Sequence, residues 1–506
     1  MLGVFIGTIL ALLITDYDVP VLLALGLAVL ATTRSFACET KDNQTIVCSK
    51  CGTTDSFGNK YQCDGYKEAF KVATSGFGDE VTWLVFSAFL LGRAVEITHL
   101  GRRLSLLLIR LFARFGMLGL GYALCLAELI LAPFIPSNAA RGGSIVAPIT
   151  LALSQSLDST PENGNIRIGA FLNLVAAHAN LMSAAMYLTG TAPNPIIQAK
   201  AKEILNVDLS WGVWILGSCI PVTVVVILVP FVIFWFTRTM PGDAKEAVSS
   251  AREVSMKQLA QMGRMSNKEW MLLAVLIACL GLWTSAPWTH FSASAIAFSA
   301  SVALIYLNVL DWHEDVLGNK SAWDILFFLG GFLVLADQLT QLDITDFLGN
   351  SVASSLGGIQ GLSASIILFV VYFFTGFIFA SMTAHAIAFS PLFLAASKAL
   401  NAPSMLSAAL IGYGTGLSGC WTNFSSGSIV IYYGHGYVSQ QRWFGIGAII
   451  AFIHMIVLLS VGLAWWKIIG WYLLHALQFA LVPLRLLKNI DLLLINFHVR
   501  TSQFTL

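Results

Sequence analysis

The stretch Pro133-Phe134-Ile135-Pro136-Ser137-Asn138-Ala139-Ala140-Arg141-Gly142-Gly143 interrupts a long apolar run, and Ala380-Ser381-Met382-Thr383-Ala384-His385-Ala386 interrupts another. Each predicts a helix that is broken at membrane depth, with small hydroxyl and amide residues at the break. Irregular backbone is tolerated at that depth only where protein buries it or where it lines a cavity. Broken helices in corresponding places of two halves are typical of a transporter's binding site.

The composition agrees with a membrane location. The chain has 506 residues, of which 57% are hydrophobic and 11% charged, whereas an ordinary soluble domain carries about 25% charged residues. Residues 211–237 contain no Asp, Glu, Lys, Arg or His, and a run of that length can cross a bilayer. We therefore predict an all-α polytopic membrane protein. The net charge of +1 favours no class of partner, and no basic stripe indicates nucleic acid.

The apolar runs and polar loops give an outline of the chain. We predict spans near residues 2–14, 19–36, 81–98, 102–136 (two spans), 166–188, 211–238, 270–287, 291–310, 322–341, 362–380, 404–420 and 443–473. Residues 241–269 and the arginines that follow residue 101 are rich in positive charge, which indicates the cytoplasmic side. One span separates those arginines from the loop 37–80, so we expect that loop on the opposite side.

The two halves resemble each other, because Ser137 and Thr383 are almost as far apart along the chain as Pro148 and Pro391. A weak internal repeat of this kind is typical of inverted-repeat transporters. We divide the chain into residues 1–80 (N-terminal spans and a Cys-containing extracytoplasmic loop), 81–240 (first repeat, tip at 137–139), 241–269 (cytoplasmic linker), 270–472 (second repeat, tip at 383–385) and 473–506 (C-terminal tail).

Four of the eight cysteines, Cys38, Cys48, Cys51 and Cys63, lie in the extracytoplasmic loop. Two disulfides on an oxidising face are the main interpretation, with a zinc knot and unpaired thiols as alternatives. An oxidised loop favours the plasma membrane or another membrane of the secretory route. An organellar membrane is the alternative.

The breaks have the chemistry of an anion site. A half-helix that starts after a break presents unsatisfied N–H groups and a partial positive charge, so it can bind a carboxylate without a full charge in the bilayer. Ser137, Asn138 and Thr383 can add side-chain hydrogen bonds. A second pair of breaks follows, at residues 189–195 with Thr191 and at residues 421–428 with Ser425 and Ser426. We predict that the four breaks form one divided anion site.

Three ionisable residues near the tips each allow two interpretations. Arg141 is the only full positive charge there, and we expect it to face the cavity and hold a carboxylate with its forked donors. The alternative is that it reaches the membrane interface. His385 either contacts substrate or carries a proton, or it forms a hydrogen bond between helices. Glu128 is either a proton or cation site or the partner of an arginine.

At these residues the chain resembles the divalent anion/sodium symporter family, in the branch of citrate/tartrate exchangers and plastid 2-oxoglutarate/malate translocators. The resemblance covers residues 75–472 and rests on Gly101-Arg102-Arg103, Pro136-Ser137-Asn138, Ser381-Met382-Thr383, Asn423-Phe424-Ser425-Ser426-Gly427 and Tyr433-Gly434-His435-Gly436-Tyr437. It implies a homodimer with two inverted-topology repeats, two re-entrant helical hairpins, a scaffold and an elevator-type transport domain. It also implies that the tips bind substrate carboxylates.

The function predicted from residues and resemblance together is exchange of dicarboxylates such as 2-oxoglutarate and malate. Ala139, Ala384 and His385 depart from the family pattern and weaken the case for two sodium ions, although one site at Ser137, Asn138, Gly190 and Asn194 stays open. Sodium-coupled uptake of dicarboxylate, citrate or sulfate is the alternative, ahead of a membrane-embedded enzyme or an anion channel. The sequence carries no enzyme signature and implies no cofactor other than sodium. The predicted substrate-binding residues are Ser137, Asn138, Arg141, Thr191, Thr383, His385, Ser425 and Ser426.

Overall fold

The computed structural model describes residues 1–15, 17–54, 58, 60–162, 164–237 and 241–472, and the predicted tail 473–506 lies outside them. Within the described residues the fold is helical except for the short antiparallel strands β1 (Ala37–Glu39) and β2 (Thr45–Val47). Seven of the described helices are long and apolar enough to span a membrane. One of them, α10 (Trp211–Thr237), has 27 residues and is about 40 Å long, so it crosses the hydrocarbon core with some tilt. The predicted polytopic all-α class is confirmed.

One succession of elements occurs twice along the chain. The first comprises α4 (Glu80–Ile97), α5 (Leu100–Phe112), α6 (Gly116–Leu131), the π-helix η4 (Ala139–Val146) continued by α7 (Ala147–Ser156), α8 (Arg167–Met186), α9 (Pro193–Leu205) and α10. The second comprises α14 (Lys320–Gln341), α15 (Ile344–Ser355), α16 (Gly361–Thr375), α17 (Met382–Ala399), α18 (Ser404–Ser418), α19 (Gly427–Gly434) and α20 (Gln440–Val457), which runs on through η8 (Leu458–Gly462) and α21 (Leu463–Ile468). In each, a helical hairpin is followed by a helix broken in the middle.

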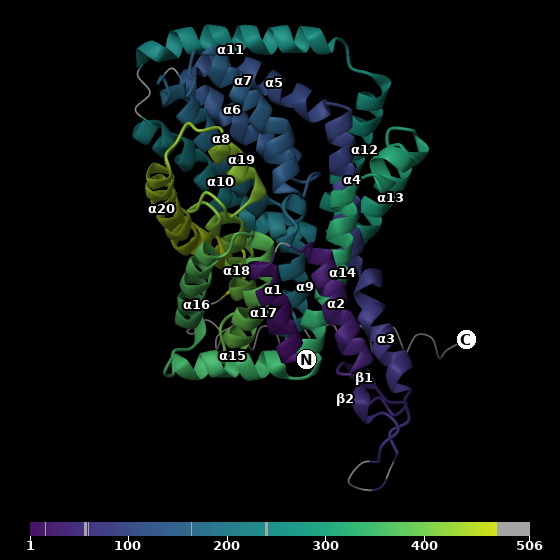
Figure 1. The fold of residues 1–506 in the computed structure, drawn as a ribbon. Coiled ribbons are helices and arrows are strands. Elements are labelled where there is room, and N and C mark those ends of the chain that lie inside the picture. Colours follow the sequence, from purple (N-terminus) through teal and green to yellow (C-terminus); the bar gives the residue numbers. More distant parts are fainter. Residues whose placement is uncertain (16, 55–57, 59, 163, 238–240, 473–506) are drawn as a thin grey trace, which may run out of the picture.

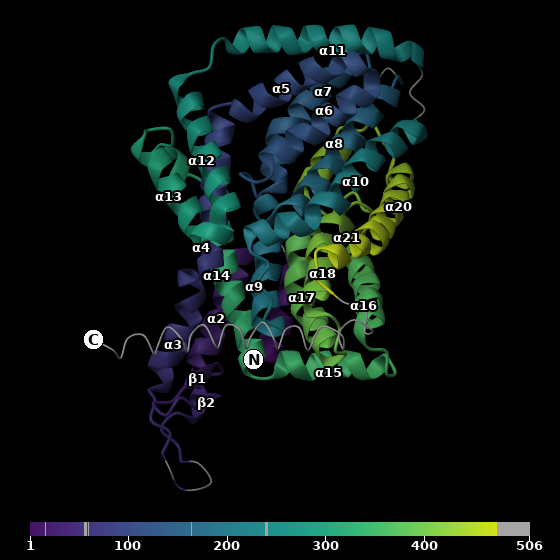
Figure 2. The ribbon, with the colours of Figure 1, turned by 180° about the vertical axis from the view of Figure 1, so that it is seen from behind.

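The two hairpins approach each other from opposite ends of the molecule. In Figures 1 and 2 the hairpin of α6 and α7 lies toward the end that α5 and α11 cover, and the hairpin of α16 and α17 lies toward the end that α15 covers. The tips of both hairpins therefore meet near the middle. The broken helices α8–α9 and α18–α19 pass beside them, and α18 packs against both α8 and α9.

The helices form two packed groups. Helices α4 and α14 pack on each other, on α2 (Val19–Thr32) and on α13 (Ala293–Tyr306), which in turn packs on α12 (Asn267–Thr289). We call these five helices the α4–α14 group. The two hairpins and the two broken helices pack on one another, and also on α5, α10 and α15, and we call them the hairpin group. The groups meet along an apolar seam, in which Val85 and Leu329 of the first lie with Ala192, Ile196 and Ile387 of the second.

The predicted linker 241–269 is mostly a helix, α11 (Pro241–Met262), which packs on α5 at one end of the molecule. Arg103 of α5 holds its C-terminus, because Nη1 donates to the Gly263 carbonyl over 2.9 Å and Nε donates to Glu269 Oε1 over 2.6 Å. Both side chains of this ion pair are buried. The arginine of the Gly101-Arg102-Arg103 motif thus joins α5, α11 and α12.

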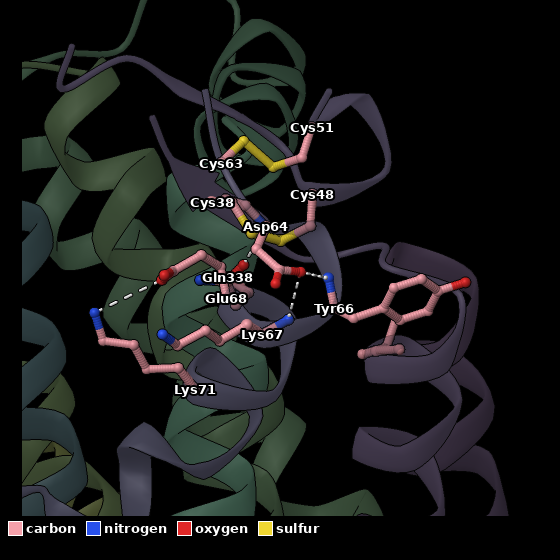
Figure 3. The surroundings of a disulfide bond; sticks show 12 residues. Cys38, Cys48, Cys51, Cys63, Asp64, Tyr66, Lys67, Glu68, Lys71 and Gln338 are labelled. Atoms are coloured by element: carbon pink, nitrogen blue, oxygen red, sulfur yellow. Dashed lines mark hydrogen bonds and ion pairs between the residues drawn. A yellow bond between two sulfur atoms is a disulfide. The ribbon is translucent and has the colours of Figure 1, made fainter. Parts of the chain in front are cut away.

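The cysteine loop lies at the opposite end from α11 (Figure 1). The structure pairs Cys38 with Cys48 and Cys51 with Cys63, as the two-disulfide interpretation predicted. Figure 3 shows both bridges above α3 (Gly65–Ser75), whose first turn is capped by the side chain of Asp64. The loop is also tied to α14, because the Ala37 amide donates to Gln338 Oε1.

Candidate anion-binding site

The four polar breaks converge on one cavity of about 240 Å³. Its polar lining comes from the first tip, the second tip and both helix breaks: Ser137, Asn138, Thr191, Ser381, Thr383, Ser425 and Ser426. Six of the eight predicted binding residues are in this set, and Ser381 is a further lining residue. None of the lining residues carries a charge. The cavity is a place where an anion would meet hydroxyl and amide groups only.

Helix N-termini supply the positive potential that the lining lacks. Helices η4, α9, α17 and α19 begin at residues 139, 193, 382 and 427, and each has its first residue or its N-cap in the cavity wall. Each N-terminus carries roughly half a positive elementary charge. At α9 the first residue is Pro193, which has no N–H, so α9 adds potential but fewer hydrogen bonds. Four such ends around one small cavity favour an anion with more than one negative charge.

A buried network behind the first tip holds the two halves of the site together. Asn180 of α8 donates to Glu128 Oε2 over 2.9 Å and accepts from the Ser428 hydroxyl over 2.7 Å. The Tyr432 hydroxyl donates to the Gly142 carbonyl over 3.0 Å. Asn180, Ser428 and Tyr432 were not among the site residues predicted from the sequence. Asn180 could have been found, because an amide inside an apolar span marks a functional or packing contact.

Arg141 does not face the cavity, so that prediction is wrong. The side chain is fully buried, and Nε donates to Glu128 Oε2 over 2.7 Å. Nη1 donates to the carbonyls of Ile135 and Gly190, and Nη2 donates to the carbonyl of Asn180. The chain turns at the tip, so the arginine points back into the hairpin. Glu128 is the partner of an arginine, which was one of its two predicted roles.

His385 also lies outside the cavity wall. Its side chain is 1% exposed, Nε2 forms a hydrogen bond of 3.0 Å with the Thr375 hydroxyl, and the ring packs 4.4 Å from that of Tyr372. It lies two residues beyond Thr383 on α17, and side chains two apart on a helix do not share a face. His385 therefore joins α16 to α17, which is the alternative interpretation made from the sequence.

The predicted sodium ligands are divided between the cavity and the buried network. Ser137 and Asn138 line the cavity, but the Gly190 carbonyl accepts from Arg141 over 2.8 Å and Asn138 Oδ1 accepts from Arg141 over 3.4 Å. The amide nitrogen of Asn194 donates to the carbonyls of Ala184 and Tyr187. A guanidinium therefore already contacts two of the four predicted ligands.

A second, larger cavity of about 760 Å³ lies between the start of α4, the end of α9 and the α12–α13 connection. Its wall contains the carboxylates of Asp79, Glu80, Glu203 and Asp208, with Lys202 as the one lysine. Such a wall repels a dicarboxylate. This larger cavity is therefore not a candidate site for a dicarboxylate.

Comparison with known proteins gives three findings. The family described as "Sodium:sulfate symporter transmembrane region" matches residues 1–472. The putative malate transporter YflS of Bacillus subtilis is 36% identical over 397 residues, covering 78% of this chain and 82% of the relative, and the L-tartrate/succinate antiporter of Escherichia coli is 31% identical over 399 residues, covering 78% and 80%. The crystal structure of the Alcanivorax borkumensis YdaH transporter has the same fold, with a TM-score of 0.55 at 16% identity, and covers 89% of this chain and 98% of that one.

Proposed function

This multi-pass membrane protein belongs to the divalent anion/sodium symporter family, and from that premise we propose that it exchanges dicarboxylates such as 2-oxoglutarate and malate without sodium. Its family and relatives are transporters and not enzymes. The relatives named for malate and for tartrate/succinate exchange support a dicarboxylate substrate. Chemistry on the substrate forms no part of the proposal.

The observation that carries the proposal is the uncharged cavity at four helix N-termini. A dicarboxylate can place its two carboxylates at different tips, where N–H and O–H donors replace its water. The cavity of about 240 Å³ is smaller than the roughly 300–1,000 Å³ of sites for drug-sized ligands. Its size and potential therefore both favour a small dianion.

The position of Arg141 supports sodium independence. A sodium ion at the predicted ligands would have to displace the guanidinium from Asn138 Oδ1. The guanidinium also donates hydrogen bonds to the carbonyls of Gly190 and Asn180, and the first of these is a predicted sodium ligand. We propose that the buried Arg141–Glu128 ion pair fills the place that a transported cation would take.

The two packed groups suggest how the cavity changes sides. Apolar side chains line the seam between them, so sliding along it need not break hydrogen bonds there. In the proposed cycle the hairpin group carries the anion past the α4–α14 group, and the protein works as a homodimer, as the family resemblance implies. Because an empty hairpin group returns slowly in an exchanger, uptake depends on a second anion inside.

Purified protein in liposomes tests the proposal. Vesicles loaded with malate should take up labelled 2-oxoglutarate, whereas empty vesicles should not. Uptake into empty vesicles that is driven by a sodium gradient would establish the symport alternative. Flux that neither saturates nor responds to internal malate would indicate a channel.

A further inference from the structure

One wall of the cavity does not come from the tips or the helix breaks. Phe89 of α4 and Ile325 of α14 line it, and both are half-buried hydrophobic residues at the edge of the apolar seam. All other lining residues belong to the hairpin group. The α4–α14 group therefore presents only these two apolar side chains to the cavity.

This arrangement divides the cavity by chemistry. Hydroxyls, amides and helix N-termini all lie on the hairpin group, so carboxylates bind there. The carbon chain of a bound acid then faces Phe89 and Ile325. A third carboxylate that pointed at this wall would lose its hydration and find no donor, and such burial of an unpaired charge is costly.

We propose that Phe89 and Ile325 determine substrate size and charge. They admit four- and five-carbon dicarboxylates and exclude six-carbon tricarboxylates such as citrate. This inference rests on the proposed function, since it concerns the same cavity. It adds that selection is made by the α4–α14 group, whereas affinity for carboxylates comes from the hairpin group.

Competition in malate-loaded liposomes tests the inference. In the unchanged protein, citrate should compete with labelled malate far more weakly than succinate does. Phe89→Ala removes the ring and should improve inhibition by citrate about tenfold, since hydrophobic pockets discriminate single groups by 10–200-fold. The malate concentration for half-maximal uptake, measured for each variant, serves as the reference for this comparison. Ile325→Ala should also strengthen the inhibition of malate uptake by citrate.

A matched control comes from the same seam. Phe328 lies on α14 in the apolar seam but does not line the cavity, so Phe328→Ala should leave the citrate-to-malate ratio unchanged. If the Phe89→Ala protein fails to reach the membrane, the Ile325→Ala and Phe89→Leu proteins replace it in the competition test. Equal inhibition by citrate and malate in the unchanged protein, or no shift in any cavity variant, would overturn the inference while leaving dicarboxylate exchange standing. Absence of malate uptake in the unchanged protein would instead overturn the proposed function.

Discussion

Asn138 has a hydrogen-bond donor that the protein itself does not use. Its side chain is 7% exposed and lines the cavity, and Nδ2 has no partner among the described residues. A buried donor of this kind is costly unless a ligand accepts its hydrogen bond. We expect it to donate to a substrate carboxylate.

Asn138→Ala should therefore raise the concentration for half-maximal malate uptake by tenfold to a hundredfold, because a hydrogen bond to a charged group contributes about 1.5–3 kcal/mol. Asn138→Asp keeps the shape of the side chain but repels a dianion, so it should raise the concentration for half-maximal uptake further than Asn138→Ala does. Asn350→Ala, on the exposed face of α15, is the control. Normal malate uptake by the Asn138→Asp protein would show that Asn138 does not contact the substrate.

Arg141 should behave as a structural residue. Removing one partner of a buried ion pair costs about 3–5 kcal/mol, so Arg141→Ala should lower the melting temperature in detergent and the yield of folded protein. Arg141→Lys keeps the positive charge but not the forked donors of the guanidinium. Its melting temperature should therefore lie between those of Arg141→Ala and the unchanged protein. The exposed Arg110→Ala should melt like the unchanged protein. If the Arg141→Ala protein is as stable as the unchanged protein but does not take up malate, the arginine binds substrate and this prediction is wrong.

The sequence could predict which residue types meet at the site, but not where every side chain points. Ser137, Asn138 and Thr383 were found because small polar residues at a mid-membrane break have few other reasons to be there. The predicted positions of Arg141 and His385 were wrong, because a shift of one residue along a tip turns a side chain from the cavity into the protein interior. Only the surrounding carbonyls decide that direction, and they come from α8 and its break.

Arg103 and Arg102 are neighbours in the sequence, but we expect their substitution to have very different effects on stability. Arg103 is buried against Glu269 and the last carbonyls of α11, whereas Arg102 is exposed and contacts Gln258 over 3.3 Å. Arg103→Ala should cost several kcal/mol and expose α11 to limited proteolysis. Arg102→Ala should change stability by less than about 1 kcal/mol. Equal protease resistance of the two variants would show that α11 is held by other contacts.

The long apolar spans were predicted closely, because hydropathy decides them. The shorter helices α3, α7, α9 and α17 lie outside the predicted spans, although α7, α9 and α17 follow breaks after which half-helices were expected. Helix α11 was taken for a linker, since a polar helix on the surface has no apolar run. Its packing on α5 is a tertiary effect that local sequence does not record.

An ion pair joins the two packed groups at the cysteine-loop end. Lys200 of α9 is almost fully buried and pairs with Asp337 of α14 and with Glu203 of its own helix. The contact to Asp337 has to break if the hairpin group moves past α14. Because Asp337 is 47% exposed and Glu203 also pairs with Lys200, loss of the Asp337 contact should cost about 1 kcal/mol or less.

Asp337→Asn should therefore speed malate exchange by up to about fivefold and leave substrate affinity unchanged, with Glu203 still pairing Lys200. Asp346→Asn, on α15 near the same end, is the control. A variant with unchanged exchange rate would show that the two groups do not separate at this point.

The central claim is that helix N-termini and uncharged hydroxyl and amide donors hold a dicarboxylate with no help from a bound cation. Titration of malate into the purified protein, followed calorimetrically at constant ionic strength in sodium and in choline buffer, tests it directly. We predict the same Kd in both buffers and no sodium taken up with the anion. A malate affinity that rises in proportion to sodium concentration would contradict this account.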